Sequence, residues 1–208
     1  MPNWCNNTIT IKGSTETVKT LWDEAKEQNG LLNAMVPMPK ALEDTTSPTP
    51  EDKSQPMVDG VDNWYDWHIK YWGTKWDIDL EGLEYKDNGD GTSSITGYAD
   101  SAWSPPIEAF STFCDDMDGV FAELMYFEGG IGFTGCWSSE GADDYYEWSD
   151  CENADAVADT IPSYLDEEFN ISESMREWES EQETEAETKV RELVVEKKAV
   201  NCESKETV

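Results

Sequence analysis

Arginine is almost absent from this chain of 208 residues. The two arginines are Arg176 and Arg191, and lysine and arginine together number 14 against 46 aspartates and glutamates, which gives a net charge of −32. Proteins grip phosphate backbones mainly through arginine and lysine, and a surface this acidic repels a polyanion. The composition therefore argues against direct binding of DNA or RNA. It leaves open the binding of proteins that themselves handle nucleic acids.

Histidine is equally scarce, because His68 is the only one in the chain. A single histidine without a neighbouring cysteine or serine makes no nucleophile–base pair, and without a second histidine it makes a poor transition-metal site. The cysteines show neither the close pairs of a zinc site nor the spacing of a disulfide framework. They are Cys5, Cys114, Cys136, Cys151 and Cys202. We therefore expect no metal, no cofactor and no catalytic residues.

Long apolar runs are missing as well. Apolar residues make up 38% of the chain, and no stretch approaches the ~20 residues needed to cross a bilayer. The first residues, MPNWCNNTIT, lack the basic and apolar regions of a signal peptide. The sequence predicts a cytoplasmic protein with reduced thiols and no membrane contact.

Apolar periodicity predicts an α+β fold for residues 1–139. The expected elements are a strand at 4–12, a helix at 15–28, a hairpin of a bulged strand at 76–85 and a partner at 93–100, a helix capped by Ser104, and strands at 120–127 and 131–137. This order matches the split β-α-β pattern. We expect a ferredoxin-like β-α-β-β-α-β sandwich with an extra C-terminal strand, followed by an acidic helical tail.

Two insertions interrupt this pattern. Residues 37–60 are rich in proline and predict a long irregular excursion. Residues 63–73 are rich in tryptophan and predict a helical segment that lies on the sandwich.

The C-terminal extension, residues 140–208, has a different character. It holds 22 acidic and 6 basic side chains. We expect a short helix near 152–160 and a long exposed helix that begins at a capping box formed by Ser174 and Glu177. Its apolar positions are few, so we expect full order only on a partner.

The tryptophan-rich segment offers the best candidate binding site. One interpretation buries its large rings in the core, with His68 hydrogen-bonded at the edge of the cluster. The other leaves Trp72, Trp76 and Trp103 partly exposed around Lys75 as an anchor for a partner, because tryptophan dominates interface hot spots. The candidate interaction patch comprises Trp64, His68, Trp72, Lys75, Trp76 and Trp103.

Four fragments of residues 1–139 together resemble a known family. MPNWCNNTITIKG opens the chain, and WGTKWD, AWSPP and EGGIGFTG follow in that order. The set resembles the YubB-type, or Api-like, proteins of plasmids and bacteriophages. The resemblance implies a ferredoxin-like domain and residence on a mobile element in a bacterial host cytoplasm. It brings no enzymatic activity and no catalytic residues.

Three functional hypotheses remain at this point. The first is an accessory protein of a phage or plasmid that binds a host or phage protein through its acidic surface and aromatic patch, with counter-defence or DNA mimicry as versions of it. The second is a component of a virion or its assembly. The third is an enzyme that acts on a nucleotide or small metabolite in a pocket near His68. The sequence leaves the partner and the oligomeric state open.

Overall fold

The computed structural model describes residues 3–51 and 54–203, with side chains described up to residue 189. Its contacts divide the chain into two units, Met1–Ser149 and Asp150–Val208. The sequence predicts the boundary after residue 139. The boundary lies later because strand β6 (Asp143–Glu147) pairs with β5 (Phe133–Ser138) and extends the sheet of the first unit.

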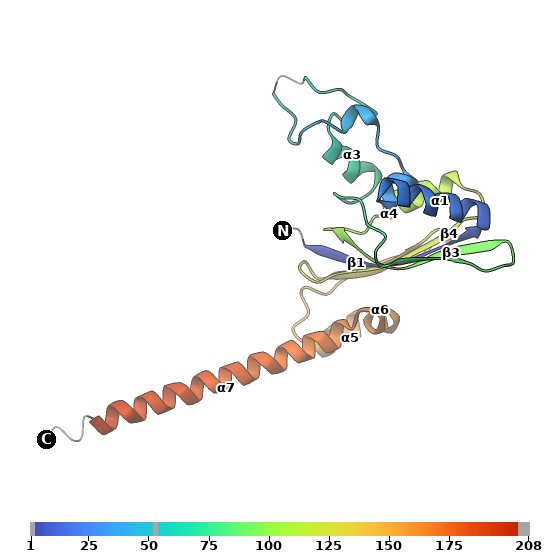
Figure 1. Ribbon diagram of the computed structural model, residues 1–208. Coiled ribbons are helices and arrows are strands. Elements are labelled where there is room, and N and C mark those ends of the chain that lie inside the picture. Colours follow the sequence, from blue (N-terminus) through green and yellow to red (C-terminus); the bar gives the residue numbers. More distant parts are fainter. Residues whose placement is uncertain (1–2, 52–53, 204–208) are drawn as a thin grey trace. The chain divides into compact units, whose positions relative to one another are not determined.

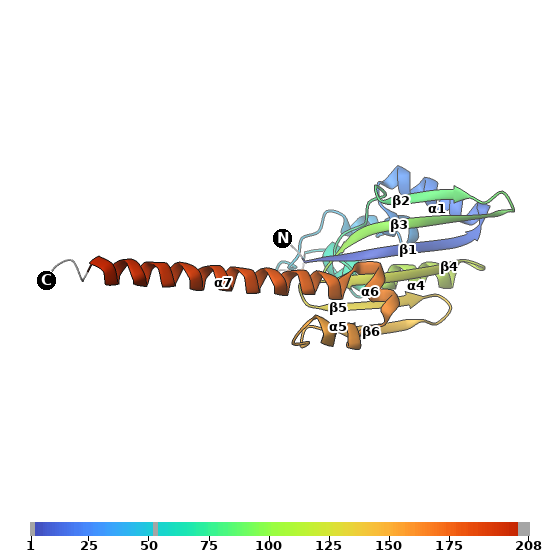
Figure 2. The same cartoon turned by 90° about the horizontal axis from the view of Figure 1, so that it is seen from below.

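A six-stranded antiparallel sheet forms the first unit (Figures 1 and 2). The other strands are β1 (Trp4–Ser14), β2 (Leu83–Asp87), β3 (Thr92–Ala102) and β4 (Phe121–Glu128). The order across the sheet is β2-β3-β1-β4-β5-β6, so β1 pairs with both β3 and β4. The predicted α+β class is confirmed, and β6 is a strand that the sequence analysis missed.

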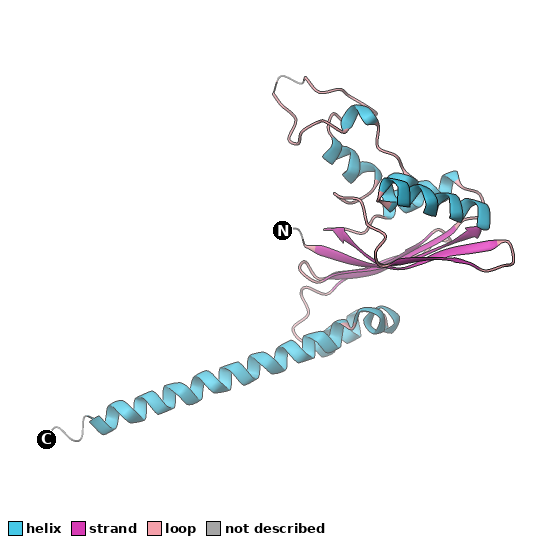
Figure 3. Ribbon diagram, in the orientation of Figure 1, coloured by secondary structure: helices cyan, strands magenta, loops and turns pink. Residues whose placement is uncertain are grey.

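Helices α1 (Thr15–Gln28) and α4 (Ile107–Asp116) lie on one face of this sheet (Figures 1 and 3). Alternate residues of β1 are buried, as the sequence predicts for this strand. Ser14 caps α1 by accepting the Thr17 N–H, and the apolar stripe of α1 is buried. The main core contains Ile9, Ile11, Val18, Leu21, Ile95, Phe110 and Leu124.

The proline-rich excursion contains little regular structure. Helix α2 (Leu31–Met35) precedes it, a single 3₁₀ turn (Lys40–Leu42) lies within it, and helix α3 (Trp64–Tyr71) follows it. Asn63 caps α3 by accepting the Asp66 N–H at 2.9 Å. The predicted tryptophan-rich helical segment at 63–73 is therefore helical over α3.

The expected bulged strand at 76–85 is extended β-structure only from Leu83 onward, and the prediction is wrong for residues 76–82, which form no strand in the described structure. Strand β2 begins only at Leu83, because the segment before it is hydrogen-bonded to helix α2. The Ile78 carbonyl accepts the Leu31 N–H at 3.0 Å, and the Asp77 carboxylate accepts two further N–H groups of α2. The alternation of apolar and acidic residues here reflects a loop with one buried residue, Ile78.

The second unit contains α5 (Ala154–Thr160), α6 (Ser163–Phe169) and α7 (Ile171–Glu203). Its small core consists of Ala154, Val157, Ile161, Leu165 and Ile171. The predicted helix near 152–160 is confirmed by α5. The predicted capping box is wrong, because α7 begins before Ser174, directly after a left-handed Asn170 that ends α6.

Among the described residues, no helix combines the length and the apolar character that crossing a membrane requires.

Candidate functional site

Two loops that lie far apart in the sequence meet at one end of the sheet. The buried Thr74 hydroxyl donates to the Ala102 carbonyl at 2.9 Å and accepts the Ala102 N–H at 3.0 Å. The Ser104 hydroxyl donates to the Gly73 carbonyl at 2.5 Å. Asn7 of β1, also buried, donates to two groups of β3 at 2.9 and 3.0 Å. The fragments WGTKWD and AWSPP are thereby held against each other and next to the N-terminal strand.

Asp77 fixes the start of the loop that follows. Its carboxylate accepts the backbone N–H groups of Leu32 at 2.7 Å, Asn33 at 3.0 Å and Ile78 at 2.8 Å. Burial raises the pKa of Asp77, and the three N–H groups oppose that rise. Since both oxygens are occupied, Asp77 supports the structure and has little capacity left for a ligand.

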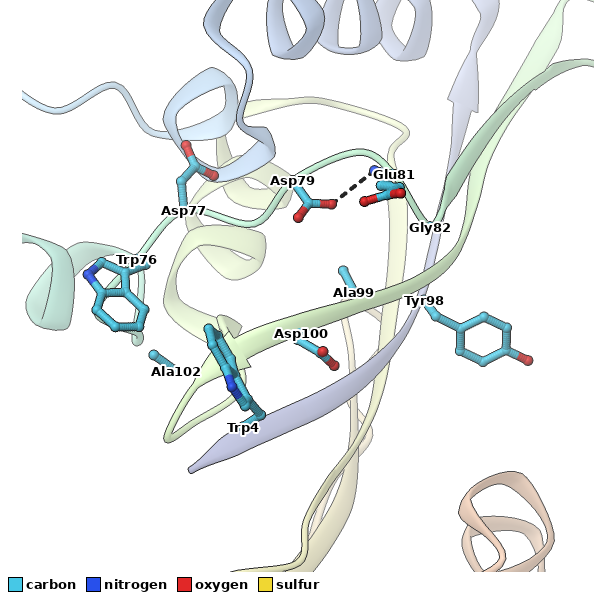
Figure 4. A pocket seen from close by; sticks show the side chains of 10 residues that line it. All are labelled: Trp4, Trp76, Asp77, Asp79, Glu81, Gly82, Tyr98, Ala99, Asp100 and Ala102. Carbon is cyan, nitrogen blue, oxygen red and sulfur yellow. Dashed lines mark hydrogen bonds between the residues drawn. The ribbon is translucent and has the colours of Figure 1, made fainter. Parts of the chain in front are cut away.

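A cavity of about 550 Å³ lies between this loop and the end of β3 (Figure 4). Trp4 and Trp76 line one end of it, with ring centroids 5.8 Å apart and planes inclined by 43°. Trp4 is 46% exposed and Trp76 is 38% exposed, which is unusual for rings of this size. We call this cavity the tryptophan pocket.

The carboxylates of Asp79, Glu81 and Asp100 also line the tryptophan pocket. Asp79 accepts the Glu81 N–H at 2.9 Å (Figure 4). Asp100 accepts the Asn6 side-chain amide at 2.7 Å. In the described part of the chain, no lysine or arginine forms an ion pair with Asp79, Glu81 or Asp100. Like charges that share one cavity repel each other, so a bound cation would be stabilised there.

The floor of the tryptophan pocket is an edge of β3. Strand β3 continues past Gly97, where its pairing with β2 ends, and its last residues border the pocket. The Gly82 carbonyl accepts the Tyr98 N–H at 3.0 Å. A Cβ atom on Gly82 would lie 2.2 Å from the Tyr98 carbonyl oxygen, so only glycine permits this approach. The alternation of an antiparallel strand directs the Asp100 backbone groups to the same edge.

Lys75 lies next to the tryptophan pocket, within a cage of three aromatic rings. Its ammonium group is 4.7 Å from the Trp76 centroid, 5.2 Å from Trp103 and 5.8 Å from Tyr65. These distances are typical of cation–π interactions. Trp103 has a φ of 71°, a strained conformation for a bulky residue. Trp76 belongs both to this Lys75 cage and to the tryptophan pocket.

His68 supports the Lys75 cage from behind. It is 9% exposed and stacks on Trp72 with centroids 3.7 Å apart. Its Nδ1 donates to the Lys75 carbonyl at 2.8 Å, while its buried Nε2 has no hydrogen-bond partner among the described residues. Burial lowers the pKa of His68, and the bond to Lys75 opposes this effect. The imidazole is therefore neutral at pH 7 and fixes the backbone of Lys75.

The predicted interaction patch divides into two layers. Lys75, Trp76 and Trp103 meet at the partly exposed cage, whereas His68 and Trp72 are buried behind it, and Trp64 packs edge-on against His68 at 5.4 Å. Of the two interpretations of Trp72, burial in the core holds and partial exposure is wrong, because this residue is 3% exposed. Its indole N–H donates to the Val36 carbonyl at 2.9 Å, which holds the ring in the core.

The loop after β4 is held by hydrogen bonds between its backbone and the Glu128 carboxylate. Glu128 is 1% exposed, and its carboxylate accepts the N–H groups of Gly130 at 3.0 Å and Ile131 at 2.5 Å. These bonds make the glycine-rich fragment EGGIGFTG a tight turn here. The described residues contain no group of three or more acidic, cysteine or histidine side chains that could hold a metal ion.

Of the residues that line the tryptophan pocket, the predicted patch contains only Trp76; it lacks Trp4 and the acidic residues Asp79, Glu81 and Asp100. The position of Trp4 carried a signal, because it falls on the opposite face of β1 from the buried residues. The acidic residues gave no such signal, because acidic residues that alternate with apolar ones are also expected in a strand with one solvent-exposed face.

No family model matches the chain, and no curated protein matches it. A solved structure that resembles part of it is the protein api92 from Yersinia pseudotuberculosis, of family DUF1281. The TM-score is 0.30 at 18% sequence identity, and the match covers 44% of this chain and 32% of that chain.

Proposed function

We propose that this protein is a non-enzymatic accessory factor that binds a basic protein through the tryptophan pocket and the acidic surface around it. The observation that carries the proposal is a cavity lined by the exposed rings of Trp4 and Trp76, in which three carboxylates have no cationic partner among the described residues. Tryptophan is the residue most enriched in interface hot spots. A net charge of −32 steers basic partners toward this surface and repels polyanions.

The biological setting is part of the same proposal. The partner is a host or phage protein in a bacterial cytoplasm, and the factor is encoded by a phage or plasmid. The resemblance to Api-like proteins supports this, and the fragments that carry it lie around the tryptophan pocket and the adjacent β4–β5 turn. The strand order β2-β3-β1-β4, with α1 and α4 on one face, supports a ferredoxin-like core to which β5 and β6 are added.

DNA mimicry is a specific version of this proposal. In that version carboxylates occupy the places of phosphates, and the partner is a protein that normally handles nucleic acids. The excess of 46 acidic over 14 basic side chains supports it.

Affinity capture followed by reconstitution tests the proposal. The full chain is used to capture proteins from bacterial cells, and the partner is then purified and titrated by calorimetry. A pocket variant, Trp4→Ala with Asp100→Asn, is compared with a control variant, Trp178→Ala with Asp159→Asn, whose residues are exposed on the second unit. We expect the pocket variant to lose about tenfold or more in affinity, ~1.4 kcal/mol, and the control to bind normally.

Equal binding by both variants would contradict the pocket as the binding site. Competition by duplex DNA for the same partner would support mimicry, and its absence would remove that version while leaving the binding function intact.

A further inference from the structure

We infer that the tryptophan pocket takes a guanidinium group, the side chain of an arginine presented by the basic partner. This inference rests on the proposed function and names the chemical group that the pocket recognises. Three observations carry it: the pocket has an aromatic wall, it contains carboxylate oxygens without a partner among the described residues, and the Lys75 ammonium already lies against the Trp76 ring of that wall.

The wall already binds a cation from within the chain. The Lys75 ammonium lies 4.7 Å from the Trp76 centroid, outside the tryptophan pocket. The electron-rich faces of indole rings attract cations, and tryptophan does so best among the aromatic residues. The Trp4 ring meets Trp76 at an angle of 43° and adds a second face at the mouth of the pocket.

The carboxylates retain free acceptor capacity. Asp79 and Asp100 each use one oxygen in a hydrogen bond, to the Glu81 N–H and to the Asn6 amide. Their second oxygens, and both oxygens of Glu81, accept no hydrogen bond from the described residues. Asp77, by contrast, already accepts three backbone N–H groups, and its carboxylate is turned toward α2 (Figure 4).

Arginine suits this arrangement better than lysine. A guanidinium is flat, so it can stack on an indole while its edge donates to carboxylate oxygens in a fork. It is also less strongly hydrated than an ammonium, which lowers the free energy needed to bring it against two tryptophans. A lysine would satisfy the charge but could not stack and donate at the same time.

Peptide titrations of the full-length protein test the inference. Tryptophan fluorescence is followed with hexa-arginine, hexalysine and hexa-citrulline peptides, where citrulline keeps the shape of arginine without its charge. We expect hexa-arginine to bind about fivefold or more tightly than hexalysine, and hexa-citrulline to bind at least about tenfold more weakly than hexa-arginine. Trp4→Ala and Asp100→Asn should each weaken hexa-arginine binding by about fivefold or more, while Trp178→Ala, with its ring exposed on the second unit, should not.

The outcomes separate this inference from the proposed function. Equal affinity for hexalysine, or undiminished affinity for hexa-citrulline, would overturn the guanidinium assignment. Unchanged hexa-arginine binding by both pocket variants, or no binding by the wild type, would also overturn it. If the captured partner still depends on the pocket in those cases, the proposed function stands and only the ligand chemistry is wrong. Circular dichroism checks that each variant is folded. If Trp4→Ala unfolds, the effect of Asp100→Asn on hexa-arginine binding decides the test.

Discussion

Trp4 and Trp72 show how one residue type serves two roles in this molecule. Trp72 is 3% exposed, stacks on His68 and donates to a backbone carbonyl, so its contacts are typical of the core. Trp4 is 46% exposed and contacts one other ring, that of Trp76, at the mouth of a cavity. A ring of this size that the fold does not bury is available to a partner.

Substitution of the two residues should therefore destabilise the protein to very different extents. Trp72→Ala should lower the free energy of unfolding by about 3–5 kcal/mol, because it leaves a large cavity. Trp4→Ala should lower it by about 1 kcal/mol or less, because it removes one partly exposed ring contact. Urea denaturation measures both values. A loss on Trp4→Ala as large as that on Trp72→Ala would mean that Trp4 is a core residue.

His68 should titrate below its ordinary range. Burial lowers its pKa from 6.5, so the folded protein binds this proton less tightly than the unfolded chain. The corresponding stability is present above pH 6.5 and is lost as the pH falls through and below that value.

The single histidine makes this measurement simple, because one imidazole signal appears in the proton NMR spectrum. We expect its midpoint below 6.5, and we expect the stability difference between wild type and His68→Gln to shift in favour of the variant as the pH falls from 7 to 5. A midpoint at or above 6.5 would contradict the buried, neutral imidazole.

At the scale of elements, the loop from Gly73 to Gly82 positions the tryptophan pocket. Thr74 ties its start to Ala102, and Gly82 brings its end against Tyr98. The pocket lies between these two attachments, over the free edge of β3.

Thr74→Val tests this attachment with little change in shape. The variant leaves the N–H and carbonyl of Ala102 without their buried partner, so we expect a loss of about 2–4 kcal/mol in unfolding free energy. Hexa-arginine binding should weaken as well, because the wall carrying Trp76 is released. Thr10→Val, on the half-exposed face of β1, should stay within about 0.5 kcal/mol of wild type. If Thr74→Val were as stable as the wild type, the hydrogen bonds between Thr74 and Ala102 would not be needed for stability.

Elements with strong local signals were predictable from the sequence. The alternation in β1, the cap and stripe of α1, and the asparagine-capped α3 all follow local rules that the tertiary structure leaves unchanged. Residues 76–82 were mispredicted, because Asp77 accepts the N–H of Leu32, a residue of α2 that lies 45 positions earlier in the sequence. The tryptophan pocket was hidden for the same reason, since Trp4 and Asp100 meet Trp76 only through long-range pairing.

At the scale of the whole molecule, the two units have separate cores. Leu165 is fully buried, and Val157, Ile161 and Ile171 are further buried apolar residues of the second unit. Leu165→Ala should destabilise that unit by about 2–4 kcal/mol. Hydrogen exchange on the full chain should show faster exchange in α5 and α6 and unchanged exchange in β1 and β4. Faster exchange of the sheet amides would contradict separate cores.

In the proposed function, the acidic charge favours a basic partner, and that partner binds at the tryptophan pocket. NMR of the indole N–H groups tests this claim most directly, because each tryptophan reports its own position. When the full-length protein is titrated with hexa-arginine, we predict shifts at Trp4 and Trp76, reversed by high salt, and an unperturbed signal at Trp178 on the second unit. Shifts at Trp178 with none at Trp4 and Trp76 would contradict the account.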